Sequence, residues 1–287
     1  MYIVADIGGT NMRIAGSHDL QSFAGGPEII PTPQLYDEGI RVIIETAQRI
    51  AGVEAIQGVA IGFAGVLSRD TCGVFSSPHL VEWGGHALGG DIAHALATEV
   101  VLENDAAMVG LGEAHFGAGK GSAILAYITV STGVNGVRVI DGIIDRATWG
   151  FEIGAQYVPA IQSVNFSPQA KEGEICTLEE SVSGTAISQR FGTHPRELGK
   201  DSPVWEDLAQ TLAFGLINTI VHWSPDRIVL GGSMMNEIGI PVDRVRTHIG
   251  IHLERIPEIP EIRHSSLGDL GGLWGGLARL TSLKKKG

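Results

Sequence analysis

The chain has 287 residues, 44% of them hydrophobic, and a formal net charge of −12. This length is enough for two domains with a cleft between them, and the acidic balance argues against a dedicated nucleic-acid binder. The two cysteines, Cys72 and Cys176, exclude a disulfide framework and a cysteine-based zinc site. The first residues lack a signal-peptide pattern and no apolar run reaches the roughly 18 residues of a membrane span, so we expect a cytoplasmic protein.

The first predicted element is a strand, a glycine-rich turn and a second strand, in IVADIGGTNMRIAG from Ile3 to Gly16. The backbone N–H groups of such a turn form a concave anion site, with the hydroxyl of Thr10 beside them. Asp6 closes the first strand, and its carboxylate would repel phosphates unless a cation such as Mg²⁺ intervenes, directly or through water. The alternative is an Asp that only stabilises the turn, and Arg13 either lies near phosphates or pairs with a carboxylate.

Helices and strands alternate after this turn. A helical face runs from Ile40 to Ile50, and short apolar runs bounded by turn residues follow, among them GVAIGFAG and VVLEND. These runs are too short for helices and are typical of buried strands. The alternation predicts an α/β protein.

Asp105 follows the run VVLEN and precedes a helical pattern of small residues. Ligands of open α/β sheets bind at the carboxyl ends of strands, where a carboxylate can take the proton of a hydroxyl that attacks phosphorus. The alternative is a plain helix N-cap, a common role of Asp. Asn104 beside it either binds a hydroxyl or caps a turn.

A second strand–turn–strand segment, ILAYITVSTGVNGVRVIDG, runs from Ile124 to Gly142 and carries Thr132 in its turn. Two such turns, each opening one half of the chain, indicate a duplicated fold that holds polyphosphate between its halves. They also favour catalysis over capping as the role of Asp105.

Two acidic residues are candidates in the second half, Glu152 in WGFEIGAQ and Glu179 in CTLEESVSG. Each carboxylate either binds vicinal sugar hydroxyls or is satisfied within its loop. An irregular insertion from about Ser163 to Lys200 leads into a helix near Glu179 or Ser183. A long helix with one wide buried face is predicted from Trp205 to Val221.

Glycines mark the last predicted elements. The run RIVLGGSMM places Gly231 and Gly232 at the end of a buried strand, where a base or ribose can lie against the backbone. The final stretch GDLGGLWGGLARLTSL has small residues on one side of a helical pattern. We expect this helix to pack closely and to return to the first domain.

In this order the motifs resemble the ROK family of sugar kinases, whose members are similar in architecture to actin, Hsp70 and hexokinase. The matching segments cover essentially the whole chain: DIGGTN (6–11), GFAGVL (62–67), SPHLVEWGG (77–85), ENDA (103–106), STGVNGV (131–137), FEIG (151–154), LEESVSGTA (178–186), PDRIVLGGS (225–233) and the closing GDLGGLWGGLARL. The resemblance implies an α/β fold of two actin-like, RNase H-like domains with a nucleotide and sugar cleft between them. The small N-terminal domain would comprise residues 1–115 and a returning helix at about 271–287, and the larger domain residues 116–270.

The resemblance also implies roles for the candidate residues. Asp105 would be the general base for a sugar hydroxyl, usually the 6-hydroxyl of a hexose. The remaining sugar contacts would come from Gly65, Asn104, Glu152 and Glu179. ATP would be bound by Asp6, Gly8, Gly9, Thr10, Asn11, Thr132, Gly133, Gly231 and Gly232, with Mg²⁺ at Asp6. A homodimer is implied as well.

The chain departs from the family at its zinc motif. In the family's G-E-x-G-H motif the His touches sugar and ligates zinc, and the aligned position here is Ala155, followed by Gln156. The family's zinc-binding cysteines fall on other residues, Ala170, Glu172 and Thr177. We therefore predict no structural zinc, and the amide of Gln156 is a candidate replacement for the lost His contact.

The leading interpretation is an enzyme that phosphorylates a hexose hydroxyl with ATP and Mg²⁺, with glucose as the first substrate to test. N-acetylmannosamine, mannose and fructose are alternative acceptors, and polyphosphate is an alternative donor. A non-catalytic sugar sensor and an actin-like or chaperone-type ATPase are the competing classes. The missing zinc ligands favour the sensor, whereas the retained Asp6, Thr10 and Asp105 favour the kinase.

Overall fold

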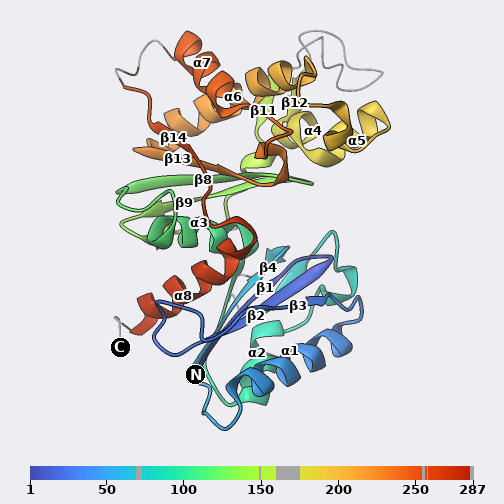
Figure 1. Cartoon of the computed structure of the whole chain (residues 1–287), viewed down its shortest axis with the longest axis vertical. Coiled ribbons are helices and arrows are strands. Elements are labelled where there is room, and N and C mark those ends of the chain that lie inside the picture. Colours follow the sequence, from blue (N-terminus) through green and yellow to red (C-terminus); the bar gives the residue numbers. More distant parts are fainter. Residues whose placement is uncertain (69–72, 149, 160–174, 254–255, 257, 285–287) are drawn as a thin grey trace. The chain divides into compact units, whose positions relative to one another are not determined.

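A computed structural model describes residues 1–68, 73–148, 150–159, 175–253, 256 and 258–284 of the chain. Cys72, Ala170 and Glu172 lie outside these described residues. The chain forms two compact units, each assembled from separate stretches (Figure 1). Unit 1 comprises Met1–Gly117, Gly142–Gly150 and Leu267–Gly287, and unit 2 comprises Ala118–Asp141 and Phe151–Ser266.

Unit 1 is built on a five-stranded mixed sheet. Its strand order is β3 (Glu28–Pro31), β2 (Asn11–Ser17), β1 (Tyr2–Ile7), β4 (Gly58–Phe63) and β7 (Val100–Asn104). The first three strands are antiparallel neighbours, and β4 pairs in parallel with both β1 and β7. The predicted first hairpin is therefore confirmed, and Asp6 lies opposite Arg13 across it.

Helices cover both faces of this sheet. They are α1 (Tyr36–Ala51), α2 (Leu88–Leu96), α3 (Asp105–Phe116) and α8 (Gly271–Lys284). Short elements complete the unit: β5 (Val66–Leu67), β6 (Val74–Ser76), η1 (Val81–Trp83), β10 (Ile143–Ile144) and η6 (Gly268–Leu270). One core places Ile3, Ile7 and Phe63 against Ile43 of α1 and Ile92 of α2.

The opposite face of the sheet packs against α3 and α8. Val4 and Ala60 of the sheet share a buried cluster with Met108, Leu273 and Leu277 of these helices. Because β1 is buried on both faces, it appears in the sequence as an unbroken apolar run.

Unit 2 repeats this arrangement with other residues. Its sheet places β9 (Val134–Ile140) beside β8 (Ile124–Val130), followed by β13 (Arg227–Gly231) and β14 (Glu261–His264). β8 and β9 form the predicted second hairpin, and β13 pairs in parallel with β8 and β14.

The remaining elements of unit 2 surround its core. They are η2 (Ile153–Ala155), β11 (Tyr157–Pro159), β12 (Ile175–Thr177), α4 (Leu178–Val182), α5 (Gly184–Phe191), η4 (Pro195–Leu198), α6 (Val204–Trp223), η5 (Ser233–Met235) and α7 (Val242–His252). Leu208, Leu212 and Leu216 of α6 are fully buried in this core. The helical pattern placed Val221 on the same face, but that residue lies near the end of α6 and is exposed.

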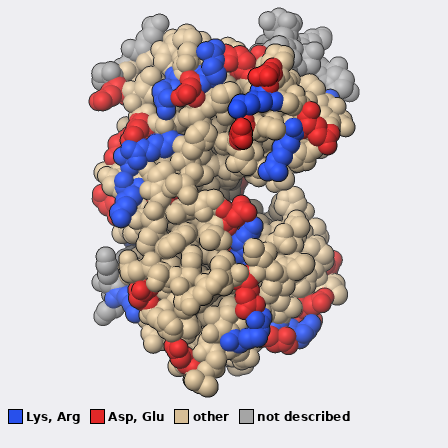
Figure 2. Space-filling model, viewed as in Figure 1, with Lys and Arg blue, Asp and Glu red and all other residues tan. Residues whose placement is uncertain are grey.

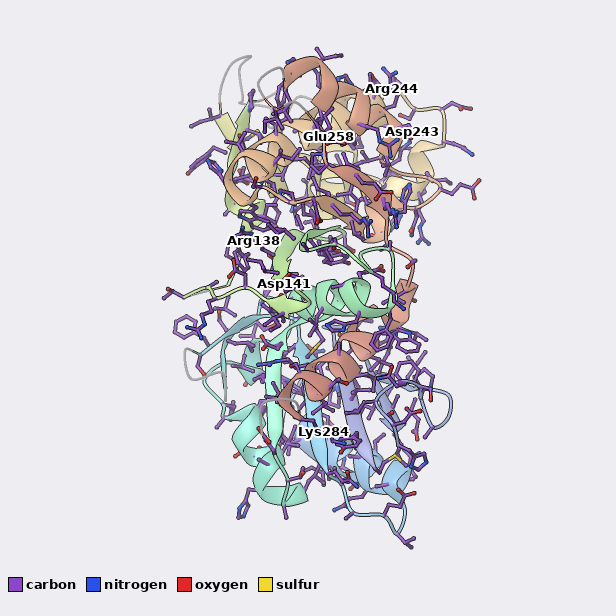
Figure 3. All side chains as sticks on the ribbon, turned by 90° about the vertical axis from the view of Figure 1, so that its left-hand side faces the viewer. Arg138, Asp141, Asp243, Arg244, Glu258 and Lys284 are labelled. Atoms are coloured by element: carbon purple, nitrogen blue, oxygen red, sulfur yellow. The ribbon has the colours of Figure 1, made fainter. Side chains whose placement is uncertain are left out.

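Charged residues fasten α7 to α6. Arg244, labelled with Asp243 on α7 in Figure 3, donates from Nε to Glu206 of α6 at 2.7 Å. His248 lies 3.0 Å from the same carboxylate. On the face shown in Figure 2, basic and acidic side chains of the described residues are interspersed. None of the described helices combines the length and the apolarity that a bilayer-spanning segment requires.

Candidate active site

The first glycine turn lies between β1 and β2 of unit 1, and its carbonyl groups accept hydrogen bonds from Thr32 and Gln34. The hydroxyl of Thr32 donates to the Gly8 carbonyl at 2.7 Å, the Thr32 N–H donates to the Thr10 carbonyl at 2.9 Å, and Gln34 donates to the Gly9 carbonyl at 3.3 Å. The N–H groups of Gly9 and Thr10 donate to none of the described residues. The turn therefore presents backbone donors in a way suited to an anion.

Asp105 begins α3 at the carboxyl end of β7, where the sequence predicted a reactive carboxylate. Asn104 is the N-cap of this helix, because its Oδ1 accepts from the Ala107 N–H at 3.2 Å. The capping role that was the alternative for Asp105 is thus filled by its neighbour. The Nδ2 atom of Asn104 donates to the Gly65 carbonyl at 3.2 Å, which brings three of the predicted sugar-contacting residues together in unit 1.

Asp6 and Asp105 both have raised pKa values, and the charge of Asp105 contributes to the shift at Asp6. Burial, with the added repulsion of Asp105, raises the pKa of Asp6 from 3.8 to about 7, and Arg13 opposes this rise. Burial also raises the pKa of Asp105, whereas the Ala106 N–H and the charge of His79 lower it. A cation would relieve this repulsion between carboxylates.

The residues around Asp6 fit Mg²⁺ that arrives with a nucleotide. The described residues contain no group of three or more His, Cys, Asp or Glu side chains that could hold a metal ion. Mg²⁺ commonly uses one or two carboxylates, phosphate oxygens and several waters, so a complete protein cage is unnecessary. Arg13 takes the second of its two predicted roles, since its Nη2 lies 3.4 Å from Asp269 and its charge acts on Asp6.

His79 is a residue of this region that sequence reasoning did not single out. A Cβ atom on Gly9 would lie 2.5 Å from the Cβ atom of His79, so the side chain covers the glycine turn closely. Ser77 fixes the loop, because its hydroxyl donates to the Ala64 carbonyl at 2.7 Å and accepts from the Leu80 N–H. The only available signal was a polar residue in the motif SPHL, which has no helical or strand periodicity.

The second glycine turn lies between β8 and β9 of unit 2 and is also enclosed by polar groups. The N–H groups of Gly184 and Thr185, at the start of α5, donate to the carbonyls of Ser131 and Thr132 at 2.6 and 3.3 Å. Gly232 has φ +93° and leaves no space for a Cβ atom beside the Val130 carbonyl. The structure therefore places the end of β13, with its two glycines, next to the end of β8.

Of the predicted acidic residues of unit 2, Glu179 contacts this turn and Glu152 lies two residues before a glycine that does. Glu179 accepts the Val134 N–H on Oε2 at 2.8 Å, and a Cβ atom on Gly133 would lie 2.7 Å from that oxygen. The other oxygen of Glu179 has no hydrogen-bond partner among the described residues. Glu152 precedes η2, whose Gly154 lies directly against the Val134 carbonyl.

The amide of Gln156 has internal partners. Its Oε1 accepts from Asn218 of α6 at 3.0 Å, and its Nε2 donates to the Ile153 carbonyl at 3.0 Å. We therefore do not assign this side chain to the sugar contact considered for it above.

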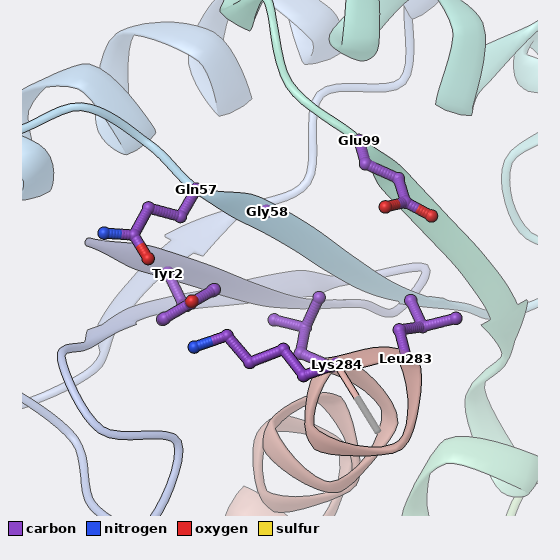
Figure 4. Close-up of a pocket in the computed structure, with 7 residues that line it drawn as sticks. Tyr2, Gln57, Gly58, Glu99, Leu283 and Lys284 are labelled. Carbon is purple, nitrogen blue, oxygen red and sulfur yellow. The ribbon is translucent and has the colours of Figure 1, made fainter. Parts of the chain in front are cut away.

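A separate pocket of about 350 Å³ lies at the amino-terminal ends of strands of the first sheet (Figure 4). It is lined by Tyr2, Gln57, Gly58, Glu99, Leu280, Leu283 and Lys284. The Lys284 ammonium lies 4.3 Å from the centre of the Tyr2 ring, a cation–π contact. Tyr2, Gly58 and Glu99 lie at the amino ends of β1, β4 and β7, and Leu280, Leu283 and Lys284 belong to α8, so the pocket is remote from the strand ends where such sheets bind ligands.

The repeated hairpin-and-parallel-strand sheets, each with a glycine turn, define an α/β protein of the actin-like class. The chain belongs to the ROK family, whose model matches residues 2–282. It is similar to a fructokinase of Pediococcus pentosaceus, with 25% identity over 230 residues that cover 78% of this chain and 79% of the fructokinase.

Two solved structures show the same fold. A ROK hexokinase from Thermus thermophilus has a TM-score of 0.80 and 24% identity, with 99% of both chains covered. A ROK family glucokinase from Streptomyces griseus, solved in complex with glucose and AMPPNP, has a TM-score of 0.75 and 22% identity. That likeness covers 97% of this chain and 98% of the glucokinase. The predicted fold class is confirmed.

Proposed function

We propose that this protein is a hexose kinase that transfers the γ-phosphoryl group of ATP to a sugar hydroxyl, with glucose as its substrate and Mg²⁺ as its cofactor. The observation that carries the proposal is the placement of Asp105 at the end of β7, with Asn104 supplying the helix cap. Family membership and the nucleotide- and glucose-bound relative support it. Fructose is the second acceptor to test, because a similar protein is a fructokinase.

The proposed reaction needs one proton transfer. Asp105 accepts the proton of the sugar hydroxyl as that oxygen forms a bond to the γ-phosphorus, and the bond from phosphorus to the ADP oxygen breaks. The raised pKa of Asp105 suits this role, because a base whose pKa lies nearer the working pH accepts a proton more readily. Mg²⁺ supplies positive charge that neutralises the phosphate oxygens, and Asp6 would hold it.

The other predicted residues receive binding roles in the same proposal. Phosphates would be held by Gly8, Gly9, Thr10, Asn11, Thr132 and Gly133, adenosine by Gly231 and Gly232, and sugar by Gly65, Asn104, Glu152 and Glu179. Exposure of Glu152 and Glu179 supports their assignment, since both residues are accessible to a ligand. A homodimer in the cytoplasm belongs to the proposal too, and sedimentation would test the dimer.

The proposal is tested by ADP release in the presence of Mg²⁺ and ATP, across glucose, fructose, mannose and N-acetylmannosamine. Release that requires one of these sugars is the expected result. Release without sugar would favour an ATPase of the same fold, and sugar binding without release would favour a sensor. Parallel assays with polyphosphate identify the donor.

The variant Asp105→Asn tests whether Asp105 is the general base. We expect kcat to fall by about a thousandfold, because general-base catalysis contributes on the order of 10²–10⁴, while sugar still raises the melting temperature. Asp37→Asn is the matched control, since Asp37 is an exposed residue in the first turn of α1. Turnover of Asp105→Asn within tenfold of the wild type would remove Asp105 from the role.

A further inference from the structure

Gln156 connects three elements of unit 2 through both its side chain and its backbone. Its Oε1 accepts from Asn218 Nδ2 of α6 at 3.0 Å, and its Nε2 donates to the Ile153 carbonyl of η2 at 3.0 Å. Its backbone carbonyl accepts from the N–H of Leu178, the first residue of α4, at 2.9 Å. One residue therefore joins η2, α4 and α6.

The groups that Gln156 holds are direct neighbours of the two proposed sugar carboxylates. Glu152 immediately precedes Ile153, and Glu179 immediately follows Leu178. Leu178 is fully buried, and a Cβ atom on Gly215 of α6 would lie 2.6 Å from its Cδ2 atom. The backbone on which Glu179 stands is thus packed on α6 on one side and hydrogen-bonded to Gln156 on the other.

The anchor of this connection belongs to a long helix that packs in the core of unit 2. Asn218 lies in the 20-residue helix α6, whose inner face forms much of the core of unit 2. By contrast, β11 and β12, which flank Gln156 and Leu178 in the chain, pair over only three residues each. A capping box between Thr177 and Glu180 stabilises the first turn of α4. These hydrogen bonds are local to α4, so they do not determine how α4 packs on α6.

We propose that Gln156 and Asn218 form a strut that positions Glu152 and Glu179, and so sets the affinity for the sugar without touching it. This inference rests on the proposed function, because it takes the two carboxylates as sugar ligands. Both amides are neutral and need no metal ion, so the strut holds its geometry independently of pH and of chelators.

Removal of either amide tests the strut. In Gln156→Met and Asn218→Leu, which keep volume but lose the hydrogen bond, we expect the KM for the sugar to rise about tenfold, because displacement of ligands by a fraction of an ångström weakens binding sharply. The KM for ATP and kcat should change by less than about twofold. Gln48→Met, at an exposed position of α1 in unit 1, is the control and should behave as the wild type.

Exchange of the two side chains distinguishes a strut from a general structural defect. The double variant Gln156→Asn with Asn218→Gln keeps the combined length of the pair, so its KM for the sugar should return to near the wild-type value, whereas each single exchange should raise it. Equal increases in the KM for sugar and for ATP would overturn the proposal. So would a double variant as impaired as the single ones, or single variants with an unchanged KM for the sugar.

Amide hydrogen exchange separates failure of this inference from failure of the proposed function. Asn218→Leu should speed exchange of the Leu178 N–H about tenfold relative to the wild type, because its acceptor loses its anchor. That measurement needs no turnover. If the wild type phosphorylates no sugar, the kinase proposal fails, and unchanged exchange at Leu178 would overturn the strut on its own.

Discussion

At the scale of single residues, Asp6 shows how the proposed site affects stability. Its carboxyl group is partly buried beside Asp105 and Asp269, and these surroundings raise its pKa to about 7. Because this carboxyl binds its proton more tightly in the folded chain than in the unfolded chain, the folded state takes up a proton between about pH 4 and pH 7. The free energy of unfolding must therefore fall as the pH rises through that window, and it stays low above it.

Asp6→Asn should accordingly raise the melting temperature at pH 8 by about 5 °C and leave it almost unchanged at pH 4, where Asp6 is protonated in the folded state. Thermal unfolding at the two pH values, without nucleotide, measures the difference. Asp37→Asn serves as the exposed control. A shift of equal size at both pH values would show that the charge of Asp6 is not its cause. The same variant should lose kinase activity.

The second prediction for a single residue concerns the effect of His79 on the pH dependence of kcat. The charge of His79 lowers the pKa of Asp105, so His79→Ala should raise that pKa and move the acidic limb of the kcat profile to higher pH. We also expect kcat at neutral pH to fall about tenfold, since the side chain covers the first glycine turn. His94→Ala, at an exposed position near the end of α2, is the matched control. A pH profile identical to that of the wild type would contradict the prediction.

The sequence indicates candidate residues for a site but not the partners of their side chains. The place of Asp105 at the end of a strand could be predicted because a carboxylate after an apolar run is a local pattern. That Asn104 is the N-cap, while Asp105 accepts only the N–H of the next residue, Ala106, on its Oδ1, follows from backbone geometry that the sequence does not show. The hydrogen bond from Val134 to Glu179 and that from Asn218 to Gln156 join residues 45 and 62 positions apart, and a single sequence holds no record of such pairings.

At the scale of elements, the glycines of α8 determine how closely that helix packs. A Cβ atom on Gly275 would overlap the Met108 carbonyl of α3, and one on Gly272 would lie 2.6 Å from the Asp6 carboxyl carbon. The backbones of α3 and α8 therefore approach more closely than residues with side chains would allow. This contact also brings the amino end of α8 against Asp6.

Gly275→Ala should destabilise the protein by about 2–4 kcal/mol, because the added carbon meets backbone that cannot rotate away. Urea unfolding followed by circular dichroism measures this loss. Gly90→Ala in α2 is the control, because its new Cβ would meet only the Ala87 Cβ at 3.7 Å. We expect no loss there, since Ala is the better helix former by up to about 1 kcal/mol. Equal stability of the two variants would contradict this account of the packing.

The elements that sequence predicted correctly are those with strong local patterns. The two hairpins, α1 and α6 follow from alternation of apolar runs with turns and from helical periodicity. The three-residue strands β11 and β12 lack such a pattern and are defined by pairing with each other. The prediction that Val221 is buried was wrong. Helical periodicity assumes that one face is buried along the whole helix, whereas the end of α6 is exposed to solvent at Val221.

At the scale of the whole molecule, each unit has a core of its own, but the two units are assembled from differently placed parts of the chain. Unit 2 consists of two stretches that lie between residues 118 and 266, whereas unit 1 draws on both the first and the last residues of the described chain. Leu273 and Leu277 of α8 cover Val4 and Ala60 of the first sheet. Unit 1 thus depends on residues that lie more than 200 positions apart.

A chain that stops at Ser266 should therefore retain the core of unit 2 and fail to fold unit 1. Amide hydrogen exchange should show slow exchange in β8 and β13 and fast exchange in β1 and β4, because the latter strands lose the apolar cover of α8. The full chain is the reference for both. Protection of β1 and β4 in the shortened chain would show that α8 is dispensable for unit 1.

The position of α8 has a consequence during synthesis on the ribosome. β1 emerges first, but the helix that covers one of its faces emerges after some 260 further residues, which at about 5–20 residues per second is a delay on the order of ten seconds or more. In that interval unit 2 can complete its own core, while Val4, Ala60 and Met108 still lack the cover of Leu273 and Leu277. The half of the protein that is made first is then the last to be completed, and the part of its sheet face that α8 will cover is the apolar surface on which a nascent-chain chaperone would act.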